Sequence, residues 1–276
     1  MPLPFRQVNV FSPDPLLGNP VAVVHDADGL SAEQMAAFAR WTNLSETTFL
    51  LRPTDATADY RLRIFTPRGE LPFAGHPTLG SAHAWLEAGG TPKDERLVQE
   101  CGVGLVRLRR AERLAFEAPP LIRSGSVDDD DLDRIAEALR IDRAEIVDSQ
   151  WVDNGARWVA VRVRDAEAVL ALAPDFGAFA GLDIGVVGQR PPGGETAVEV
   201  RGFAPDFGIP EDPVTGSLNA GLAQWLVGNG VLPASYVAAQ GTALGRAGRV
   251  HVDSDADGTI WIGGATETTI SGAVSL

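Results

Sequence analysis

The chain has 276 residues, of which 45% are hydrophobic and 22% charged, and its formal net charge is −14. No apolar run approaches the roughly 20 residues that cross a bilayer, so a soluble globular protein is expected. The negative charge favours solubility and would repel DNA, RNA and anionic lipid, so the sequence predicts neither a nucleic-acid nor a membrane partner.

The beginning of the chain and its cysteine content narrow the class further. Residues 1–11 contain no long apolar stretch followed by a small-residue cleavage site, so a cytoplasmic location is expected. Cys101 is the only cysteine, which excludes an intramolecular disulfide, a thiolate zinc site and an iron–sulfur cluster. We expect its thiol to pack as a small hydrophobic group.

The first candidate for chemistry in chain order is Glu46, which ends a polar turn at 43–46. The β-favouring residues 47–51 follow, so the carboxylate is predicted at the start of a strand. A helix capping box is the alternative, because Asn43 and Glu46 have the spacing of an N-cap and its third residue. The strand-like residues weaken that alternative. A carboxylate at such a turn suits general acid–base catalysis.

The sequence contains an internal repeat whose period is about half the chain. Three segments recur in the same order: 19–24 as 154–161, 63–67 as 201–205, and 76–81 as 212–217. The offsets of the last two pairs are 138 and 136 residues. Three matches in one order indicate a duplication, which constrains the architecture before any chemistry is considered.

Each copy of the repeat predicts a strand, a turn and a helix. Alternating residues favour strands at 60–65 and 197–203, and Ala- and Leu-rich helices are predicted at 77–87 and 213–227. Each helix would open with proline, which places His76 and Asp212 at the two N-cap positions. Both helices are apolar on nearly every side and must be covered all round. We therefore predict an α+β fold of two pseudo-symmetric halves, each a curved, mostly antiparallel or mixed sheet wrapped around a central helix.

The boundary between the halves is predicted near 118–130, which gives an N-terminal half at 1–118 and a C-terminal half at 130–276. Two prolines end a strand at 118–120, and an acidic run at 128–131 opens a new helix with apolar residues at helical spacing. The acidic run could be an interaction site, but acidic side chains in a first helical turn also complement the helix dipole. We favour the second interpretation, and we place the active-site cleft between the halves.

Two helix N-termini facing each other across that cleft would form a receptor for an anion such as a carboxylate. Gly75 and Gly216 would let the backbone approach a ligand closely, and Ser217 adds a hydroxyl donor. A small anionic organic substrate is therefore expected. A proline-initiated helix repeated by descent, without any ligand, is the alternative. No nucleotide-binding or metal-binding motif is present, so neither a cofactor nor a metal is predicted.

Four motifs together resemble those of the PhzF (phenazine biosynthesis-like) family. They are Gly18-Asn19-Pro20-Val21-Ala22-Val23, Ser45-Glu46-Thr47-Thr48-Phe49, Phe73-Ala74-Gly75-His76-Pro77 and Glu211-Asp212-Pro213-Val214-Thr215-Gly216-Ser217. A fainter late motif is Gln240-Gly241 with Gly245-Arg246; it departs from the usual pattern in having Ala239 before it and Ala247-Gly248 after it. The resemblance covers nearly the whole chain and implies the diaminopimelate-epimerase-like fold and a homodimer.

The resemblance also implies roles for individual residues. Glu46 is similar to the family's base and acid that moves a proton between carbons. His76, Asp212 and Ser217 are similar to its substrate-orienting and proton-relaying groups. Gly75 and Gly216 are similar to its backbone donors. Ser45, which precedes the base within the same motif, is expected to bind the substrate together with Ser217. The characterised activity of the family is isomerisation of trans-2,3-dihydro-3-hydroxyanthranilate without a cofactor, so an isomerase is expected here.

Two alternatives remain at this point. The first is an amino-acid epimerase or racemase on the same fold; its namesake chemistry uses one thiol from each half, and neither helix motif here contains a cysteine. The second is a non-catalytic small-molecule binder that needs the cleft but not the acid. The presence of Glu46, His76 and Asp212 together argues against the second.

Overall fold

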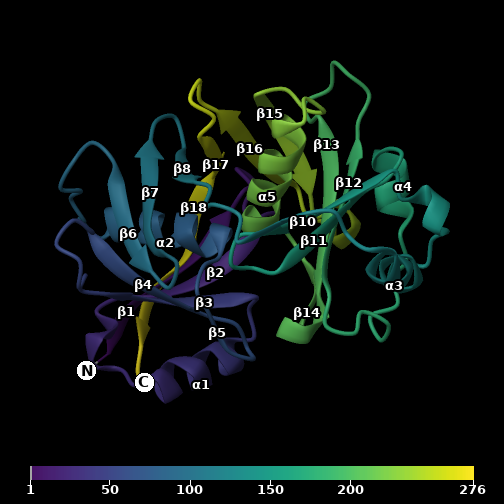
Figure 1. The fold of residues 1–276 in the computed structure, drawn as a ribbon. Helices are drawn as coiled ribbons and strands as arrows, with labels where there is room; N and C mark the ends of the chain where they lie inside the picture. Colours follow the sequence, from purple (N-terminus) through teal and green to yellow (C-terminus); the bar gives the residue numbers. More distant parts are fainter. Residues whose placement is uncertain (1) are drawn as a thin grey trace.

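The computed structural model describes residues 2–276, and their strands outnumber their helices (Figure 1). The α-helices are α1 (Ala32–Thr42), α2 (Gly75–Glu87), α3 (Asp129–Leu139), α4 (Ala166–Ala171) and α5 (Gly216–Gly228). The strands of the first part are β1 (Leu3–Val10), β2 (Asn19–Val24), β3 (Glu46–Leu51), β4 (Tyr60–Phe65), β5 (Glu70–Leu71), β6 (Leu97–Cys101), β7 (Gly104–Arg110), β8 (Leu114–Glu117) and β9 (Arg123–Gly125). Those of the second part are β10 (Asp148–Asp153), β11 (Trp158–Arg162), β12 (Asp183–Gln189), β13 (Val198–Ala204), β14 (Ile209–Asp212), β15 (Ser235–Gln240), β16 (Gly248–Ser254), β17 (Ile260–Gly264) and β18 (Thr266–Val274).

Hydrogen bonds join all these strands into one large mixed sheet, and the order of pairing repeats. In the first part β1 pairs antiparallel with β2, β2 parallel with β3, β3 antiparallel with β4, and β4 parallel with β6. In the second part β10, β11, β12, β13 and β15 pair in the same sequence of directions. The predicted α+β fold of two pseudo-symmetric halves is therefore confirmed.

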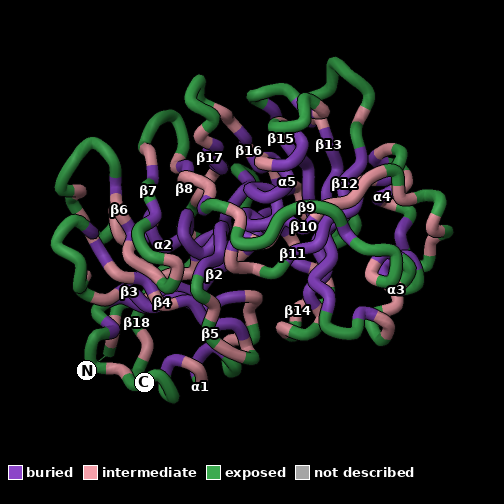
Figure 2. Tube along the Cα trace, viewed as in Figure 1, coloured by how far each residue is buried: buried purple, intermediate pink, exposed green. Residues whose placement is uncertain are grey.

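The two long apolar helices, α2 and α5, are the centres around which the sheet curves. Most of their residues are buried, and both helices lie in the interior of the molecule (Figure 2). Leu79 of α2 and Leu218 of α5 are fully buried in the main hydrophobic cluster. Burying a leucine side chain contributes roughly 1.5–3 kcal/mol, so these helices supply much of the core that holds the sheet curved.

The two helices do not begin where the sequence predicted. The N-cap of α2 is Ala74, because Thr78 N–H already donates to Ala74 O at 3.2 Å, so His76 lies inside the first turn. The N-cap of α5 is Thr215, and Asp212 is the last residue of β14. The N-cap assignments of His76 and Asp212 were therefore wrong. The prolines that follow them lack an N–H and fit either a first turn or the segment before it, so proline alone could not fix the start.

Two other local predictions are decided by backbone geometry. Asn43 is the C-cap of α1 in the left-handed region, with φ of 52°, so no capping box joins it to Glu46. Glu46 is instead the first residue of β3, as predicted. Asp128 caps α3 by accepting from Asp131 N–H at 2.9 Å, which places the acidic run in a first helical turn.

The end of the chain returns to its beginning. β18 pairs antiparallel with β1, and β17 pairs with β8, so the last two strands lie against the sheet of the first part (Figure 1). The division at 118–130 stays a prediction.

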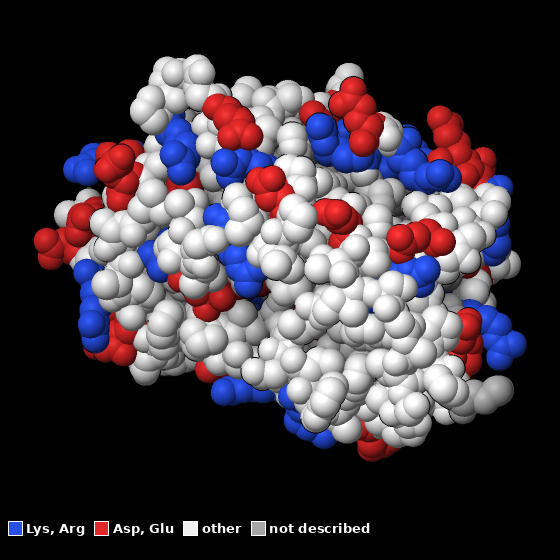
Figure 3. Space-filling model, turned by 180° about the vertical axis from the view of Figure 1, so that it is seen from behind, with Lys and Arg blue, Asp and Glu red and all other residues white. Residues whose placement is uncertain are grey.

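No helix within residues 2–276 is both long and apolar enough to span a membrane. On the face in Figure 3, acidic and basic side chains are interspersed instead of forming a basic stripe.

Candidate active site

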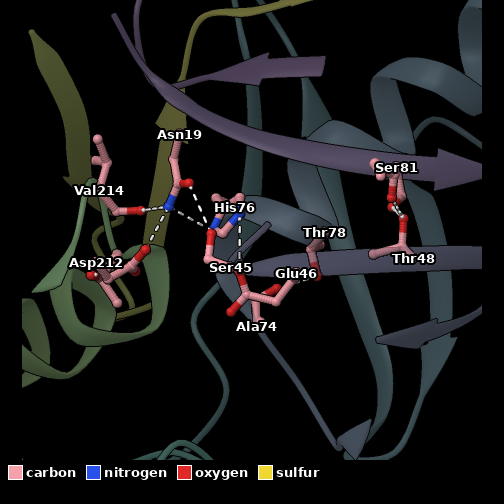
Figure 4. Close-up of polar contacts among 12 residues, drawn as sticks. Asn19, Ser45, Glu46, Thr48, Ala74, His76, Thr78, Ser81, Asp212 and Val214 are labelled. Carbon is pink, nitrogen blue, oxygen red and sulfur yellow. Dashed lines mark hydrogen bonds and ion pairs between the residues drawn. The ribbon is translucent and has the colours of Figure 1, made fainter. Parts of the chain in front are cut away.

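Three predicted catalytic residues meet in one buried location although they come from separate elements (Figure 4). Glu46 begins β3, His76 lies in the first turn of α2, and Asp212 ends β14. All three are at most 6% exposed. The fold brings Asp212 across from the second half because the N-termini of α2 and α5 point at each other.

Glu46 and His76 face each other without forming an aligned hydrogen bond. The distance between Glu46 Oε2 and His76 Nε2 is 3.2 Å. Within the described chain neither atom has a hydrogen-bond partner of good geometry. Buried polar atoms are nearly always satisfied, so two unsatisfied atoms in contact mark a place where a ligand can bind.

Asn19 is the hub that links these residues across the two halves. Its Nδ2 lies 2.7 Å from Asp212 Oδ1, 2.9 Å from Val214 O and 3.2 Å from His76 Nδ1. Its Oδ1 accepts a hydrogen bond from Ser45 Oγ at 3.1 Å. Ser45 therefore positions the hub in this structure, whereas the sequence predicted it as a substrate-binding residue.

The contact with Asn19 selects the tautomer of His76. An amide nitrogen can only donate, so the His76 Nδ1 that faces it must be free of a proton to avoid two donors in contact. The neutral ring then carries its proton on Nε2, on the side of Glu46. His76 can thus present a hydrogen-bond donor at the carboxylate.

Burial shifts the pKa values of all three groups. It raises the pKa of Glu46 well above its ordinary value, and the nearby charge of Asp212 raises it further. Burial lowers the pKa of His76 to about 3, so the ring is neutral at physiological pH. Burial also raises the pKa of Asp212 to about 6, although hydrogen bonds from Thr215 and Asn19 oppose that shift. A carboxyl with a raised pKa can both accept and return a proton near neutral pH.

The N-termini of α2 and α5 almost touch at two glycines. A Cβ atom built on Gly75 would lie 2.6 Å from Gly216 Cα, which is closer than any side chain allows. Ser217, the next residue of α5, accepts a hydrogen bond from Trp158 Nε1 at 3.1 Å. The free N–H groups of both first turns therefore face one region, as an anion receptor requires.

A small cavity lies beside these groups. Its lining includes Glu46, Asp183, Asp212, Trp158 and Ser217. Its free volume is about 40 Å³, room for a few water molecules, whereas ligand cavities commonly measure roughly 300–1,000 Å³. A ring-sized substrate would therefore require the walls to move apart.

The late motif supports Asp212 from behind. Gln240 Nε2 donates to Asp212 O at 3.2 Å and to Thr215 Oγ1 at 2.8 Å, and Thr215 Oγ1 donates to Asp212 Oδ2 at 2.6 Å. Arg246 reaches back to Leu16 O at 2.5 Å. The motif thus fixes the orientation of one catalytic candidate without lining the cavity itself.

Sequence reasoning missed three residues of this site: Asn19, Trp158 and Asp183. Asn19 was part of a quoted motif, and its position before Pro20 was its signal. Asp183 stands 137 residues after Glu46, which is the period of the repeat, so the duplication could have revealed it. Trp158 carried no signal beyond lying in a repeated segment. Cys101 ends β6, partly buried against the core, and does not line the cavity.

Comparisons with known proteins match one family over most of the chain. Residues 8–272 match the family described as phenazine biosynthesis-like protein, PhzC-PhzF. The chain is 36% identical to antisense-enhancing sequence 1 of Schizosaccharomyces pombe, with 97% of each chain covered. It is 34% identical to trans-2,3-dihydro-3-hydroxyanthranilate isomerase of Pseudomonas aeruginosa, with 91% of this chain and 90% of that protein covered.

The chain belongs to the PhzF family. A crystal structure of a PhzF-family phenazine biosynthesis protein from Enterococcus faecalis superposes with a TM-score of 0.80 at 25% identity, over 100% of both chains. Several relatives of this PhzF-family chain are named isomerases, and the chain is an isomerase. The resemblance read from the four motifs is thereby confirmed. No group of three or more metal-binding side chains occurs in the part of the chain that the structure describes.

Proposed function

We propose that this isomerase moves a proton between carbons of a small unsaturated carboxylate similar to dihydro-hydroxyanthranilate. Glu46 acts as the base that removes the proton and the acid that returns it, and no cofactor takes part. One observation carries the proposal: Glu46 lines the cavity, and its buried Oε2 has no hydrogen-bond partner in the described chain. The name of the Pseudomonas aeruginosa relative supports the choice of substrate class.

The substrate carboxylate would bind between the N-termini of α2 and α5. Backbone N–H groups at Gly75 and Gly216, with the Ser217 hydroxyl, would hold its oxygens through charge-assisted hydrogen bonds. Removal of a carbon-bound proton leaves negative charge that spreads over the conjugated system. The two helix N-termini stabilise that charge where it develops, which is where electrostatic catalysis is most effective.

The proton would leave and return through one carboxylate. Ionised Glu46 takes the proton from a tetrahedral carbon and becomes neutral, and its carboxyl proton can exchange with solvent. Glu46 then gives a proton to a different carbon of the conjugated anion, so the double bonds shift and the atoms balance. The Nε2–H of neutral His76 would hold Glu46 or a substrate oxygen in place during the transfer. Asp212 would orient the substrate from the opposite half.

The Glu46→Gln variant tests the assignment, since glutamine keeps the size but cannot take a proton. With trans-2,3-dihydro-3-hydroxyanthranilate in D₂O, followed by NMR, we expect wild-type isomerisation and deuterium incorporation and a loss of roughly 10²–10⁴-fold in the variant. Binding of benzoate, measured by calorimetry, should persist. Glu33→Gln, on the exposed surface of α1, is the matched control and should react like wild type. Normal turnover by Glu46→Gln would contradict the mechanism.

The two alternatives give different results in the same assay. A two-thiol epimerase is disfavoured because Cys101 lies away from the cavity. Deuterium at the α-carbon of diaminopimelate or proline would favour an epimerase instead. Affinity for a panel of unsaturated acids without any exchange in the wild-type protein would favour a non-catalytic binder.

A further inference from the structure

The duplication places a second acidic residue at the position that corresponds to Glu46. In the first half, the residue after Glu46 pairs with Phe65; in the second half, the residue after Asp183 pairs with Phe203. Phe65 and Phe203 are themselves equivalent in the repeat. Each acid also begins a strand that pairs in parallel with its predecessor, β3 with β2 and β12 with β11. Asp183 is therefore the pseudo-symmetric counterpart of Glu46.

The environment of Asp183 is that of a ligand-binding carboxylate. The residue is 2% exposed, and it lines the cavity that contains Glu46. Its Oδ1 is buried without a hydrogen-bond partner in the described chain. The nearest cation, Arg157, has its Nε 3.9 Å from Oδ2, and the Arg157 side chain is largely exposed. Burial raises the pKa of Asp183 to about 7, although Arg157 opposes that shift.

Burial of the Asp183 carboxylate without a hydrogen-bond partner costs free energy unless a ligand supplies that partner. An unsatisfied buried acceptor loses its hydration without gaining a partner, and a buried carboxylate loses more than a neutral group does. The hydrogen bonds of the Asn19 hub, which join His76, Asp212 and Ser45, do not include Asp183. Asp183 thus lines the same cavity as Glu46, on the wall that the second half contributes.

We propose that Asp183 is a substrate-binding residue whose free carboxylate oxygen accepts a hydrogen bond from an amino or hydroxyl group of the substrate. This inference rests on the proposed function, since it concerns the same cavity. The substrate class narrows to unsaturated carboxylates that also carry an N–H or O–H donor. Binding at both ends, with the carboxylate at α2 and α5 and the donor at Asp183, fixes which carbon lies beside Glu46.

Binding of matched aromatic acids tests the proposal without requiring turnover. We would measure, by calorimetry at pH 8, the affinities of benzoate and of 2-, 3- and 4-aminobenzoate for wild type, Asp183→Ala and Asp183→Asn. At least one aminobenzoate should bind wild type about 10- to 100-fold more tightly than benzoate, the range of a hydrogen bond to a charged group. The preference should disappear in Asp183→Ala and weaken in Asp183→Asn, while benzoate affinity stays nearly constant.

A control variant at a nearby acid and a second substitution of Asp183 complete the test. Asp206→Ala removes a nearby exposed acid that is not part of the cavity wall, and should keep the wild-type preference. If Asp183→Ala does not fold, the isosteric Asp183→Asn decides. Equal affinities of all four acids for wild type, or a preference that survives both substitutions, would overturn the proposal. Because the readout is binding, an active Glu46→Gln would refute the proposed mechanism and leave this inference standing.

Discussion

Glu46 differs from the other acids of this chain in what surrounds it. Most carboxylates here are exposed, whereas Glu46 is buried next to a neutral histidine and near a second buried acid. Desolvation favours the neutral form of a carboxyl, and a neighbouring negative charge does so as well. Glu46 therefore holds a proton more tightly than a surface glutamate does, so it can return a proton as well as accept one.

The pH dependence of activity should report this environment. Glu46 must be ionised to remove a proton, so kcat/KM should rise with pH, about tenfold per unit, until the pH passes its raised pKa. His76, with a pKa of about 3, should not change the slope of the pH–rate profile between pH 4 and 9. Asp212→Asn removes the neighbouring charge that raises the pKa of Glu46, so the rising limb should move to lower pH. A pH–rate profile of both proteins measures this.

A limb that stays at the same pH in Asp212→Asn would contradict the coupling between the two acids. The absolute rate of that variant is expected to fall as well, because Asp212 would also orient the substrate. Only the position of the limb therefore bears on the prediction.

At the scale of elements, the site depends on how closely two helices approach. Gly75 and Gly216 meet where α2 and α5 begin, and both lack the Cβ atom that would separate them. The helices supply part of the core through their apolar surfaces, and in the proposed mechanism their N-termini bind the substrate carboxylate. The same two glycines therefore determine how closely the helices pack and the shape of the proposed binding site.

The Gly216→Ala substitution should lower both the stability and the activity of the protein. The new Cβ would lie 2.8 Å from Gly75 Cα and 3.1 Å from His76 N, and backbone atoms cannot rotate away. We expect a loss of roughly 1–3 kcal/mol in the free energy of unfolding, typical of overpacking, together with reduced activity. Urea denaturation and the exchange assay measure the two effects.

Gly228→Ala is the matched control, at the other end of the same helix. A Cβ built there meets nothing within 4 Å, so this variant should be unchanged or slightly more stable. Equal effects of the two substitutions would mean that helix propensity, and not the close approach, determines the result.

The whole molecule carries a cluster of buried acids at the junction of its halves, and its stability should depend on pH accordingly. Burial raises the pKa values of Asp183, to about 7, and Asp212, to about 6, as well as that of Glu46. A raised folded-state pKa means that the folded protein binds the proton more tightly than the unfolded chain does. The stabilising contribution is therefore complete below about pH 4 and is lost as pH rises through about 6–7.

Asp183→Asn should remove part of this dependence. At pH 8 the variant no longer buries an ionised group, and one pKa unit corresponds to ~1.4 kcal/mol, so a gain on the order of 2–4 kcal/mol in the free energy of unfolding is expected. Thermal melts of both proteins between pH 5 and 8 measure it. A variant whose melting temperature falls as steeply as that of wild type would contradict the prediction.

The sequence by itself determined the duplication, the α+β class, the two fully apolar helices and the strand that begins with Glu46. These follow from local periodicity and from residues repeated at a fixed offset, which need no knowledge of distant contacts. The family followed from four motifs. The first residue of each of these helices could not be predicted from the sequence, because a proline fits several positions around a first turn.

Only the tertiary structure decided which side chains share the cavity. Asn19 links His76 to Asp212 because the fold brings residues nearly 200 positions apart in the sequence within hydrogen-bond distance. The burial of Asp183 depends on the packing of β12 against β11 and beside α5, and no local pattern distinguishes it from an exposed aspartate. Burial and proximity between distant segments set the protonation of each acid, and those quantities exist only once the chain has folded.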